Sequence, residues 1–317
     1  MIKSGKIDPM LNLSGTTLGE SFNLCDGQRF KDQINPASCS GFLVASNIMV
    51  TAGHCIKNQN DCDNYKWVFD FDTNETQLKS SQIYSCKKLI KRKLESNGAD
   101  FAVFEIDRHA YDRKPLKFRR EGEISQGAGL VVIGHPSGLP TKIADGAAVR
   151  DESNPDFFVA NLDTFGGNSG SAVFNAETGL VEGILVRGET DYVSDTQNGE
   201  TCRKVYECKN TECRGEDVTK ITIVEGLPKE QAPSYASTMK SINDGTAEIV
   251  KMGGELPFFG IQFQGHLLGG RKFLDICGLQ TSTTQDSNIW LASYLGDCKN
   301  TDNISQIYEK FVELSND

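Results

Sequence analysis

The stretch Gly166-Gly167-Asn168-Ser169-Gly170-Ser171 decides how the rest of the chain is interpreted. Glycines on both sides of Ser169 allow a tight turn and let another molecule approach the backbone closely. A serine hydroxyl on such a turn, with backbone N–H groups aimed at a substrate carbonyl, is what acyl transfer requires. Gly, Ser and Asn also build ordinary turns, so this stretch alone only suggests a nucleophile.

Two upstream motifs supply the partners that such a serine needs. Residues 50–55 (VTAGHC) contain His54 as a general base, and residues 99–103 (ADFAV) contain Asp100 as the carboxylate that orients it. A lone histidine or aspartate is usually structural, so the prediction depends on all three residues occurring together. The order His, Asp, Ser is that of the chymotrypsin-type triad and differs from the subtilisin and α/β-hydrolase orders. An α/β-hydrolase also needs glycine where Ser171 stands.

With the Cys39-Ser40-Gly41 string added, four motifs have the order and spacing of one family. Over about residues 25–225 the chain resembles the trypsin- and chymotrypsin-like serine peptidases. It is most similar to their bacterial branch, which includes the glutamyl endopeptidases. The resemblance implies two six-stranded β-barrels with the triad His54, Asp100 and Ser169 at their junction. It also implies an oxyanion hole formed by the backbone N–H groups of Gly167 and Ser169.

The resemblance also implies a disulfide and a substrate pocket. Cys39 and Cys55 are the pair that the family bridges behind the catalytic histidine. Asp163, six residues before Ser169, stands where trypsin-like members place the floor of the specificity pocket, and a buried carboxylate there would bind Arg or Lys. The other residues placed on the pocket are Thr164, Leu185 and Arg187.

Two of these positions leave the preferred side chain open. Leu185 stands where the glutamyl branch has a histidine, which weakens a preference for glutamate. Arg187 either neutralises Asp163 or accepts an acidic side chain. Asn168 replaces the aspartate that trypsin-like zymogens pair with a newly formed N-terminal ammonium, so activation is not expected to use such an ammonium beside Asn168.

The hydrophobic pattern independently favours an all-β architecture from about Cys39 onward. Short apolar runs at residues 42–45 and 48–51 flank a Ser46-Asn47 turn, as in a hairpin that ends near His54. Further strands are predicted at residues 130–133 and 172–174. Many short strands separated by Gly, Pro and Asn turns are typical of sandwiches and barrels.

The composition changes twice along the chain, which predicts three parts. Residues 1–24 are polar and are interpreted as an N-terminal extension outside the core. Residues 25–227 form the peptidase domain, and a linker rich in Pro and charge follows. Residues 238–317 are predicted to be a small β-rich accessory domain whose tail contains one amphipathic helix.

Ten cysteines without metal-type Cys/His clustering indicate an oxidising compartment. Among the pairs, Cys62 with Cys86 and Cys277 with Cys298 are suggested by proximity, and a zinc site at Cys202, Cys208 and Cys213 is disfavoured because no histidine lies near. No cofactor or metal is expected. The protein is expected to be secreted or periplasmic, with no signal peptide in this chain.

Charge and hydropathy restrict the partners. The net charge of −10 argues against nucleic acid, and the one basic run, residues 87–93, is interpreted as a solvated loop or strand edge. No apolar run is long enough for membrane insertion. The expected partners are therefore protein or peptide substrates.

The preferred prediction is an active serine endopeptidase, and two alternatives to it remain open. In the first, the chain is a latent or inactive binding protein of the same fold, with its cleft blocked by the N-terminal segment. In a second alternative the C-terminal part is the main functional module and docks substrates or surfaces.

Overall fold

The computed structural model describes residues 1–229, apart from 73–75, 111–112 and 209–211. The chain divides into two compact units, Met1–Asp107 with Pro115–Glu230 and Arg108–Lys114 with Gln231–Asp317. The β-rich domain and helix predicted for residues 238–317 lie outside the described residues, as does the Cys277–Cys298 pair. The predicted domain boundaries stay predictions.

The first half of the larger unit is a six-stranded antiparallel sheet in the order β1-β4-β5-β6-β3-β2. The predicted hairpin is present, since β2 and β3 pair with Phe42 opposite Val50, and His54 follows directly after β3. Asp100 begins β6, which is buried along nearly all of its length. The strands are β1 (Ile2–Lys3), β2 (Phe42–Ala45), β3 (Ile48–Thr51), β4 (Tyr65–Val68), β5 (Ile83–Leu94) and β6 (Asp100–Ile106).

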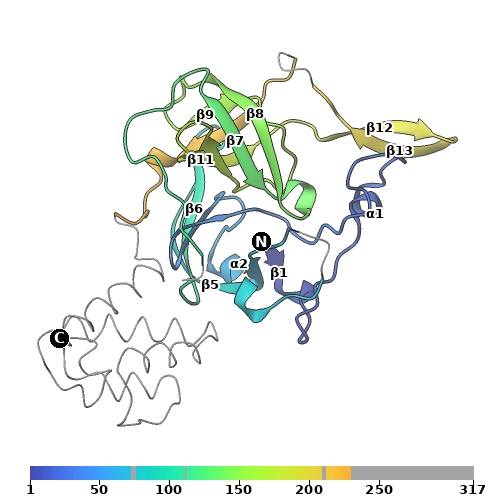
Figure 1. Cartoon of the computed structure of the whole chain (residues 1–317), viewed down its shortest axis with the longest axis horizontal. Coiled ribbons are helices and arrows are strands. Elements are labelled where there is room, and N and C mark those ends of the chain that lie inside the picture. The colour runs from blue at the N-terminus through green and yellow to red at the C-terminus, as the bar shows by residue number, and fades with distance from the viewer. Residues whose placement is uncertain (73–75, 111–112, 209–211, 230–317) are drawn as a thin grey trace, which may run out of the picture. The chain divides into compact units, whose positions relative to one another are not determined.

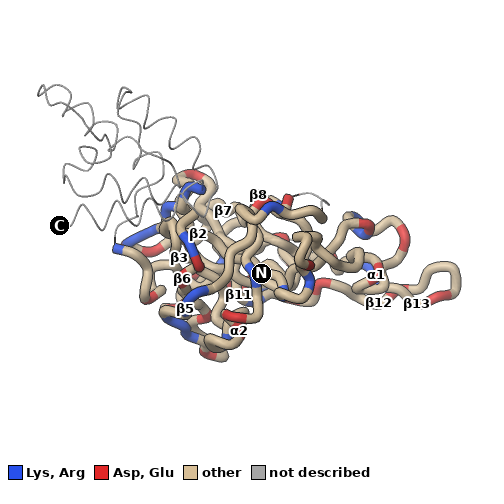
Figure 2. The backbone as a smooth tube through the Cα atoms, turned by 90° about the horizontal axis from the view of Figure 1, so that it is seen from below, with Lys and Arg blue, Asp and Glu red and all other residues tan. Residues whose placement is uncertain are grey.

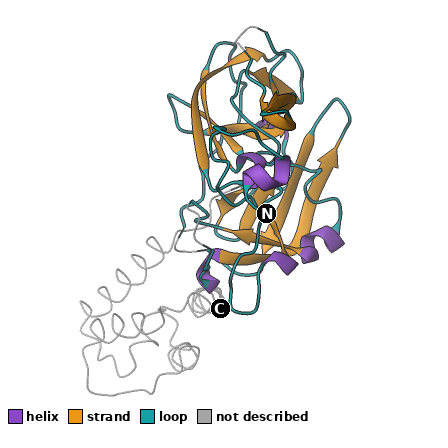
Figure 3. Ribbon diagram, turned by 90° about the vertical axis from the view of Figure 1, so that its right-hand side faces the viewer, coloured by secondary structure: helices purple, strands orange, loops and turns teal. Residues whose placement is uncertain are grey.

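The second half closes into a barrel in the order β10-β11-β14-β9-β8-β7. Its interior is filled by apolar side chains from alternate positions, including Leu130, Val132, Phe158, Val173 and Leu185. The fold is therefore the predicted all-β, chymotrypsin-like double barrel, with the first barrel open and the second closed (Figure 3). The strands are β7 (Gly129–Gly134), β8 (Lys142–Asp151), β9 (Phe157–Ala160), β10 (Ala172–Asn175), β11 (Val181–Arg187) and β14 (Glu216–Lys220).

The N-terminal segment differs from the expectation that residues 1–24 lie outside the core. Ile2 pairs with Lys66 of β4, and Ile2 and Leu13 pack in an apolar cluster with Phe71 and Leu78. The segment is polar on average, but several of its apolar residues are buried, and Ile2 and Leu13 are only 1% and 3% exposed. The average composition of residues 1–24 therefore did not predict that part of this segment packs in the core.

A two-stranded hairpin, β12 (Tyr192–Gln197) with β13 (Glu200–Val205), extends from the second barrel beside the N-terminal helix α1 (Leu18–Phe22) (Figure 1). A disulfide between Cys25 and Cys202 joins it covalently to the N-terminal segment. The backbone of residues 23–25 hydrogen-bonds to Arg203, and Gln28 accepts from Val205 N–H. Segments almost 180 residues apart thus form one small layer.

Helices are short in the described residues, and none is long and apolar enough to cross a membrane. Helix α1 begins at a capping box, in which Thr17 Oγ1 accepts from Glu20 N–H and the Glu20 carboxylate accepts from Thr17 N–H. Helix α2 (Gln59–Asn64) holds Cys62, which is bonded to Cys86 of β5. The 3₁₀ turns are η1 (Ser4–Lys6), η2 (Ser80–Gln82), η3 (Pro136–Gly138) and η4 (Ile221–Ile223).

The basic run at residues 87–93 lies on β5, where Figure 2 shows Lys and Arg gathered. Strand β4 pairs only with residues 83–85 of β5, so the basic part pairs with β6 alone and is a strand edge, as predicted. Ion pairs neutralise part of the charge: Lys87 with Glu105, Lys91 with Glu225 and Lys93 with Glu95. Lysine on such an edge also opposes edge-to-edge aggregation.

His135 provides a test of how burial affects stability. Its ring stacks on Phe71 with centroids 5.9 Å apart, and Nδ1 hydrogen-bonds to the carbonyl of Leu139 at 2.9 Å. Burial, with a smaller contribution from the amino group of Met1, lowers the pKa of His135 to about 4. Because the unfolded chain binds this proton at higher pH, the stabilisation is present above pH 6.5 and is lost as the pH falls toward 4.

We expect the free energy of unfolding to fall by up to about 3 kcal/mol through this one group between pH 7 and pH 4. The measurement is urea unfolding of the wild type and of His135→Gln at several pH values. The difference between the two proteins should shrink as the pH falls. A difference that stays constant with pH would show that His135 is not held neutral.

Candidate active site

Ser169 stands on a tight turn that leads into β10. Gly167 and Gly170 flank it with φ angles of +92° and +91°, in the left-handed region that glycine adopts at least cost. A Cβ added to Gly170 would lie 2.1 Å from the carbonyl oxygen of Ser40. The turn therefore requires glycine at both positions.

The backbone N–H groups of residues 166–171 divide into two sets. Within the described part of the chain, those of Gly167 and Ser169 donate to no protein acceptor. Unpaired N–H groups are uncommon in folded proteins, so these two are available to a substrate oxygen. They are the same two donors that the resemblance implies. The other four donate to Asp191 Oδ2 (from Gly166), Phe165 O (from Asn168), Leu185 O (from Gly170) and Asn168 O (from Ser171).

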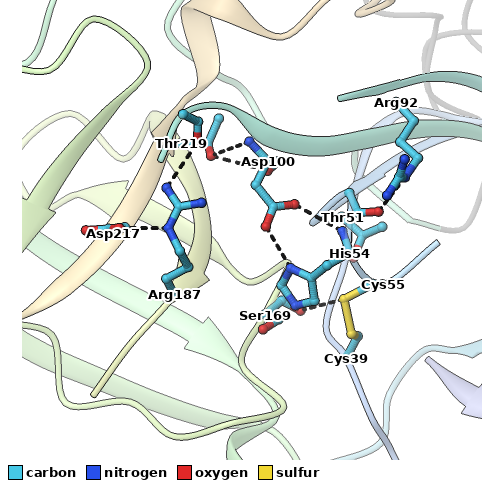
Figure 4. A network of polar contacts seen from close by, with 12 residues as sticks. Cys39, Thr51, His54, Cys55, Arg92, Asp100, Ser169, Arg187, Asp217 and Thr219 are labelled. Carbon is cyan, nitrogen blue, oxygen red and sulfur yellow. Dashed lines mark hydrogen bonds and ion pairs between the residues drawn. A yellow bond between two sulfur atoms is a disulfide. The ribbon is translucent and has the colours of Figure 1, made fainter. Parts of the chain in front are cut away.

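His54 and Asp100 are brought together by β3 and β6 (Figure 4). The Nδ1 atom of His54 lies 2.7 Å from Asp100 Oδ2, and the backbone N–H of His54 donates to Oδ1 at 3.1 Å. The Asp100 side chain is 2% exposed, whereas that of His54 is 35% exposed. Figure 4 shows Ser169 next to the imidazole ring of His54. The carboxylate is thus fixed in the interior while the other edge of the ring is accessible.

Thr219 on β14 joins Asp100 to the second barrel. Its hydroxyl accepts from the Asp100 N–H and lies 3.2 Å from the Asp100 carbonyl oxygen, to which it also donates. Arg92 on β5 donates from Nε to the carbonyl of Gly53 at 2.7 Å, which holds the turn before His54. No local pattern in the sequence marked Thr219 or Arg92, because both act across the sheets.

The structure contains the disulfide that the resemblance implies between Cys39 and Cys55. The neighbouring Ser40 N–H donates to the Ser169 carbonyl at 2.8 Å, so the Cys39–Cys55 disulfide and the turn that carries Ser169 are adjacent. The donor atoms of Cys39, His54 and Cys55 lie within 4.8 Å of one another, but both sulfurs are consumed by the bridge. They therefore do not offer thiolates to a metal ion. All cysteines in the described residues are in disulfides, including the Cys62–Cys86 pair suggested by proximity.

The four predicted pocket residues are in different surroundings. Asp163 is exposed, and Thr164 is half-buried. The Leu185 side chain is 3% exposed and belongs to the barrel core. Arg187 points to β14, where Nε donates to Asp217 Oδ2 at 2.8 Å, and Nη2 donates to the carbonyl of Gly98. Its charge is therefore balanced by Asp217 and not by Asp163.

Glu216 is an acidic residue that the sequence analysis missed. It is 7% exposed, contacts Gly188 and accepts a hydrogen bond from Thr164. Burial, followed by the nearby charge of Asp191, raises the pKa of Glu216 to about 7, and the Thr164 hydrogen bond opposes that rise. It stands at the start of β14, 47 positions after Ser169, and no motif marks it.

The Asn168 amide is buried and accepts from Ser171 Oγ at 3.2 Å. The amino group of Met1 donates instead to the carbonyl of Cys39, at 2.7 Å. In this structure an amide–hydroxyl bond thus takes the place of the ion pair that an aspartate would make at this position.

A known peptidase domain family matches the part of the chain that carries the predicted triad. The model of the trypsin-like peptidase domain matches residues 39–184, which include His54, Asp100 and Ser169. The chain contains a trypsin-like peptidase domain, and that class of domain is a serine peptidase. No curated protein matches the chain.

Three solved structures to which the chain is similar are distant from it in sequence. An inactive form of the Rv3671c protease is 16% identical, with 60% of this chain and 81% of that chain covered and a TM-score of 0.39. A Glu endopeptidase in complex with MPD is 20% identical, with 59% and 82% covered and a TM-score of 0.40. Neuropsin, a serine protease expressed in the limbic system of mouse brain, is 16% identical, with 58% and 84% covered and a TM-score of 0.42.

The Thr219 hydroxyl gives a direct test of the link between the two barrels. In Thr219→Val both hydrogen bonds to the Asp100 backbone are lost, so the free energy of unfolding should fall by about 1–3 kcal/mol. The measurement is chemical denaturation. As a control, Thr201→Val at an exposed position of β13 should change the free energy of unfolding by less than about 0.5 kcal/mol. Equal losses in the two variants would contradict a special role for Thr219.

Proposed function

We propose that the chain is a secreted serine endopeptidase with His54, Asp100 and Ser169 as its catalytic triad. The observation that carries this is the 2.7 Å contact between His54 Nδ1 and the buried Asp100 carboxylate, with Ser169 next to the same ring. Four disulfides in the described residues favour an oxidising compartment, which supports secretion.

In the proposed mechanism the Asp100 carboxylate accepts a hydrogen bond from Nδ1–H of His54, which keeps the proton on Nδ1 and leaves the Nε2 lone pair free to act as a base. Ser169 Oγ attacks the scissile carbonyl as its proton passes to Nε2. The negative charge on the former carbonyl oxygen is stabilised by the N–H groups of Gly167 and Ser169. The imidazolium then protonates the leaving amine, and an acyl-enzyme ester remains on Ser169.

Water completes the cycle by the same route. His54 takes a proton from a water molecule, which attacks the ester carbonyl, and the oxyanion again binds to the two N–H groups. Collapse of the tetrahedral intermediate breaks the bond to Ser169 Oγ, which recovers its proton from His54. The products are one carboxylic acid and one amine, and the enzyme is unchanged.

The proposed side-chain preference before the scissile bond is for Arg or Lys. Asp163 is an exposed carboxylate, Glu216 is a buried one beside Thr164, and Asp217 balances Arg187. A basic side chain would therefore meet negative charge that Arg187 does not neutralise.

The triad is tested by labelling with a fluorophosphonate probe. We expect the wild type to be labelled, Ser169→Ala to stay blank and His54→Ala to react at least 10³-fold more slowly, because the base is lost. Ser153→Ala, an exposed loop serine, is the matched control and should label like the wild type. A full-length wild type that stays blank would contradict the proposal and favour the binding-protein alternative.

The preference is tested with a peptide library varied at the residue before the scissile bond. We expect Arg and Lys to be selected, and Asp163→Asn or Glu216→Gln to weaken that selection by about tenfold because one charge is removed. Asp145→Asn, an exposed carboxylate on β8, serves as the control. Selection of Glu, or no effect of either variant, would contradict the proposal.

A further inference from the structure

The peptide bond between Gly166 and Gly167 presents one of the two free N–H groups. Two consecutive glycines have wide conformational freedom, so their own backbone preferences do not fix which way this peptide faces. A reversal would put the Gly166 carbonyl where the Gly167 N–H must meet a substrate oxygen. The orientation therefore depends on partners elsewhere in the chain.

The carbonyl end of this peptide is held by turn η3. The Ser137 N–H donates to the Gly166 carbonyl at 2.5 Å. In a trans peptide the C=O and N–H bonds point in opposite directions, so this contact turns the Gly167 N–H away from η3. The fit is close, because a Cβ on Gly167 would lie 2.8 Å from Gly138 N and from His135 O.

Asp191 and Tyr192, at the base of the hairpin β12–β13, hold the adjoining groups. Asp191 Oδ2 accepts the Gly166 N–H at 2.8 Å. Tyr192 OH lies 2.7 Å from Ser137 Oγ, in a hydrogen bond with the residue that holds the carbonyl. Ser137 has φ +50° and ψ +21°, a conformation that is costly for a non-glycine residue and needs support from its surroundings.

The hairpin base is in turn fixed by packing. The Tyr192 ring lies 5.6 Å from that of Phe165, the residue before Gly166, and 4.8 Å from that of Phe22 in the N-terminal segment. The Cys25–Cys202 disulfide closes the same layer. A rigid support of this kind is what a precisely oriented donor requires.

We propose that Asp191 and Tyr192 are positioning residues that hold the Gly166–Gly167 peptide with the Gly167 N–H directed at the reacting carbonyl. The inference rests on the proposed serine peptidase function and deepens it. In this role the exposed hairpin is part of the catalytic apparatus, although neither residue touches the substrate.

The test uses the full chain and a small chromogenic ester. Asp191→Ala should lower kcat by about 10- to 100-fold and leave KM within about threefold, because loss of a complete oxyanion donor costs about 10²–10³. Asp191→Asn keeps an acceptor for the Gly166 N–H and should recover most of the activity. Tyr192→Phe should reduce kcat by a few fold, and the double variant with Asp191→Ala should approach the full loss.

The control is Asp195→Ala. Asp195 lies on β12, and its carboxylate pairs with Lys204 at the surface. This variant should leave kcat unchanged. A fall in the unfolding midpoint of Asp191→Ala with unchanged kcat would overturn the proposal, as would an equal loss of activity in Asp191→Asn.

A second measurement does not depend on activity. In ¹⁵N-glycine NMR spectra the Gly166 and Gly167 amide signals should shift in Asp191→Ala and stay in place in Asp195→Ala. If the wild type fails to react with the ester or the probe, the proposed function fails, and these signals still decide whether Asp191 holds the peptide. Unmoved signals would overturn the inference even in an active enzyme.

Discussion

The site depends on the hydrogen bonds between the Asp100 backbone and the Thr219 hydroxyl. Asp100 belongs to the first sheet and Thr219 to the second barrel, so these bonds fix the half that carries His54 against the half that carries Ser169. Both residues are at most 2% exposed. Leaving one of these buried hydrogen bonds unformed would cost free energy, because a buried group has little access to solvent that could replace the bond. This cost favours a single arrangement of the two halves.

Charge is distributed unequally between the two halves of the site. On the first sheet, the carboxylate of Asp100 is satisfied by His54 through the ring and through the backbone. On the second barrel, Glu216 is buried and forms no ion pair with a cation of the described residues, and burial followed by the charge of Asp191 raises its pKa. Arg187 and Arg214 both pair with Asp217 instead. The charge of Asp100 is thus balanced within the protein, whereas Glu216 is one of the carboxylates on which the proposed preference for a basic side chain rests.

The sequence predicted what depends on local pattern. The hairpin at residues 42–51, the strand after Ser169 and the left-handed glycines follow from spacing and from the chemistry of glycine. It did not predict distant partners: Arg187 was expected to neutralise Asp163 or to accept an acidic side chain, whereas in the structure it pairs with Asp217 on the neighbouring strand. It also misjudged residues 1–24, since a few apolar side chains in a polar segment do not show where they pack. Asp191 and Glu216 have no motif because their roles arise from contacts across the fold.

The Cys25–Cys202 bridge makes most of the described chain a covalent ring, which contains every strand of the two barrels except β1 and β14. A peptidase is exposed to its own activity, and the loops of this ring are the first places to be cut. One cut between residues 25 and 202 opens the ring but releases no fragment, because the two pieces stay joined through sulfur. Such a nicked molecule would still migrate as one species until a reductant separates it, and both barrels would keep their partners.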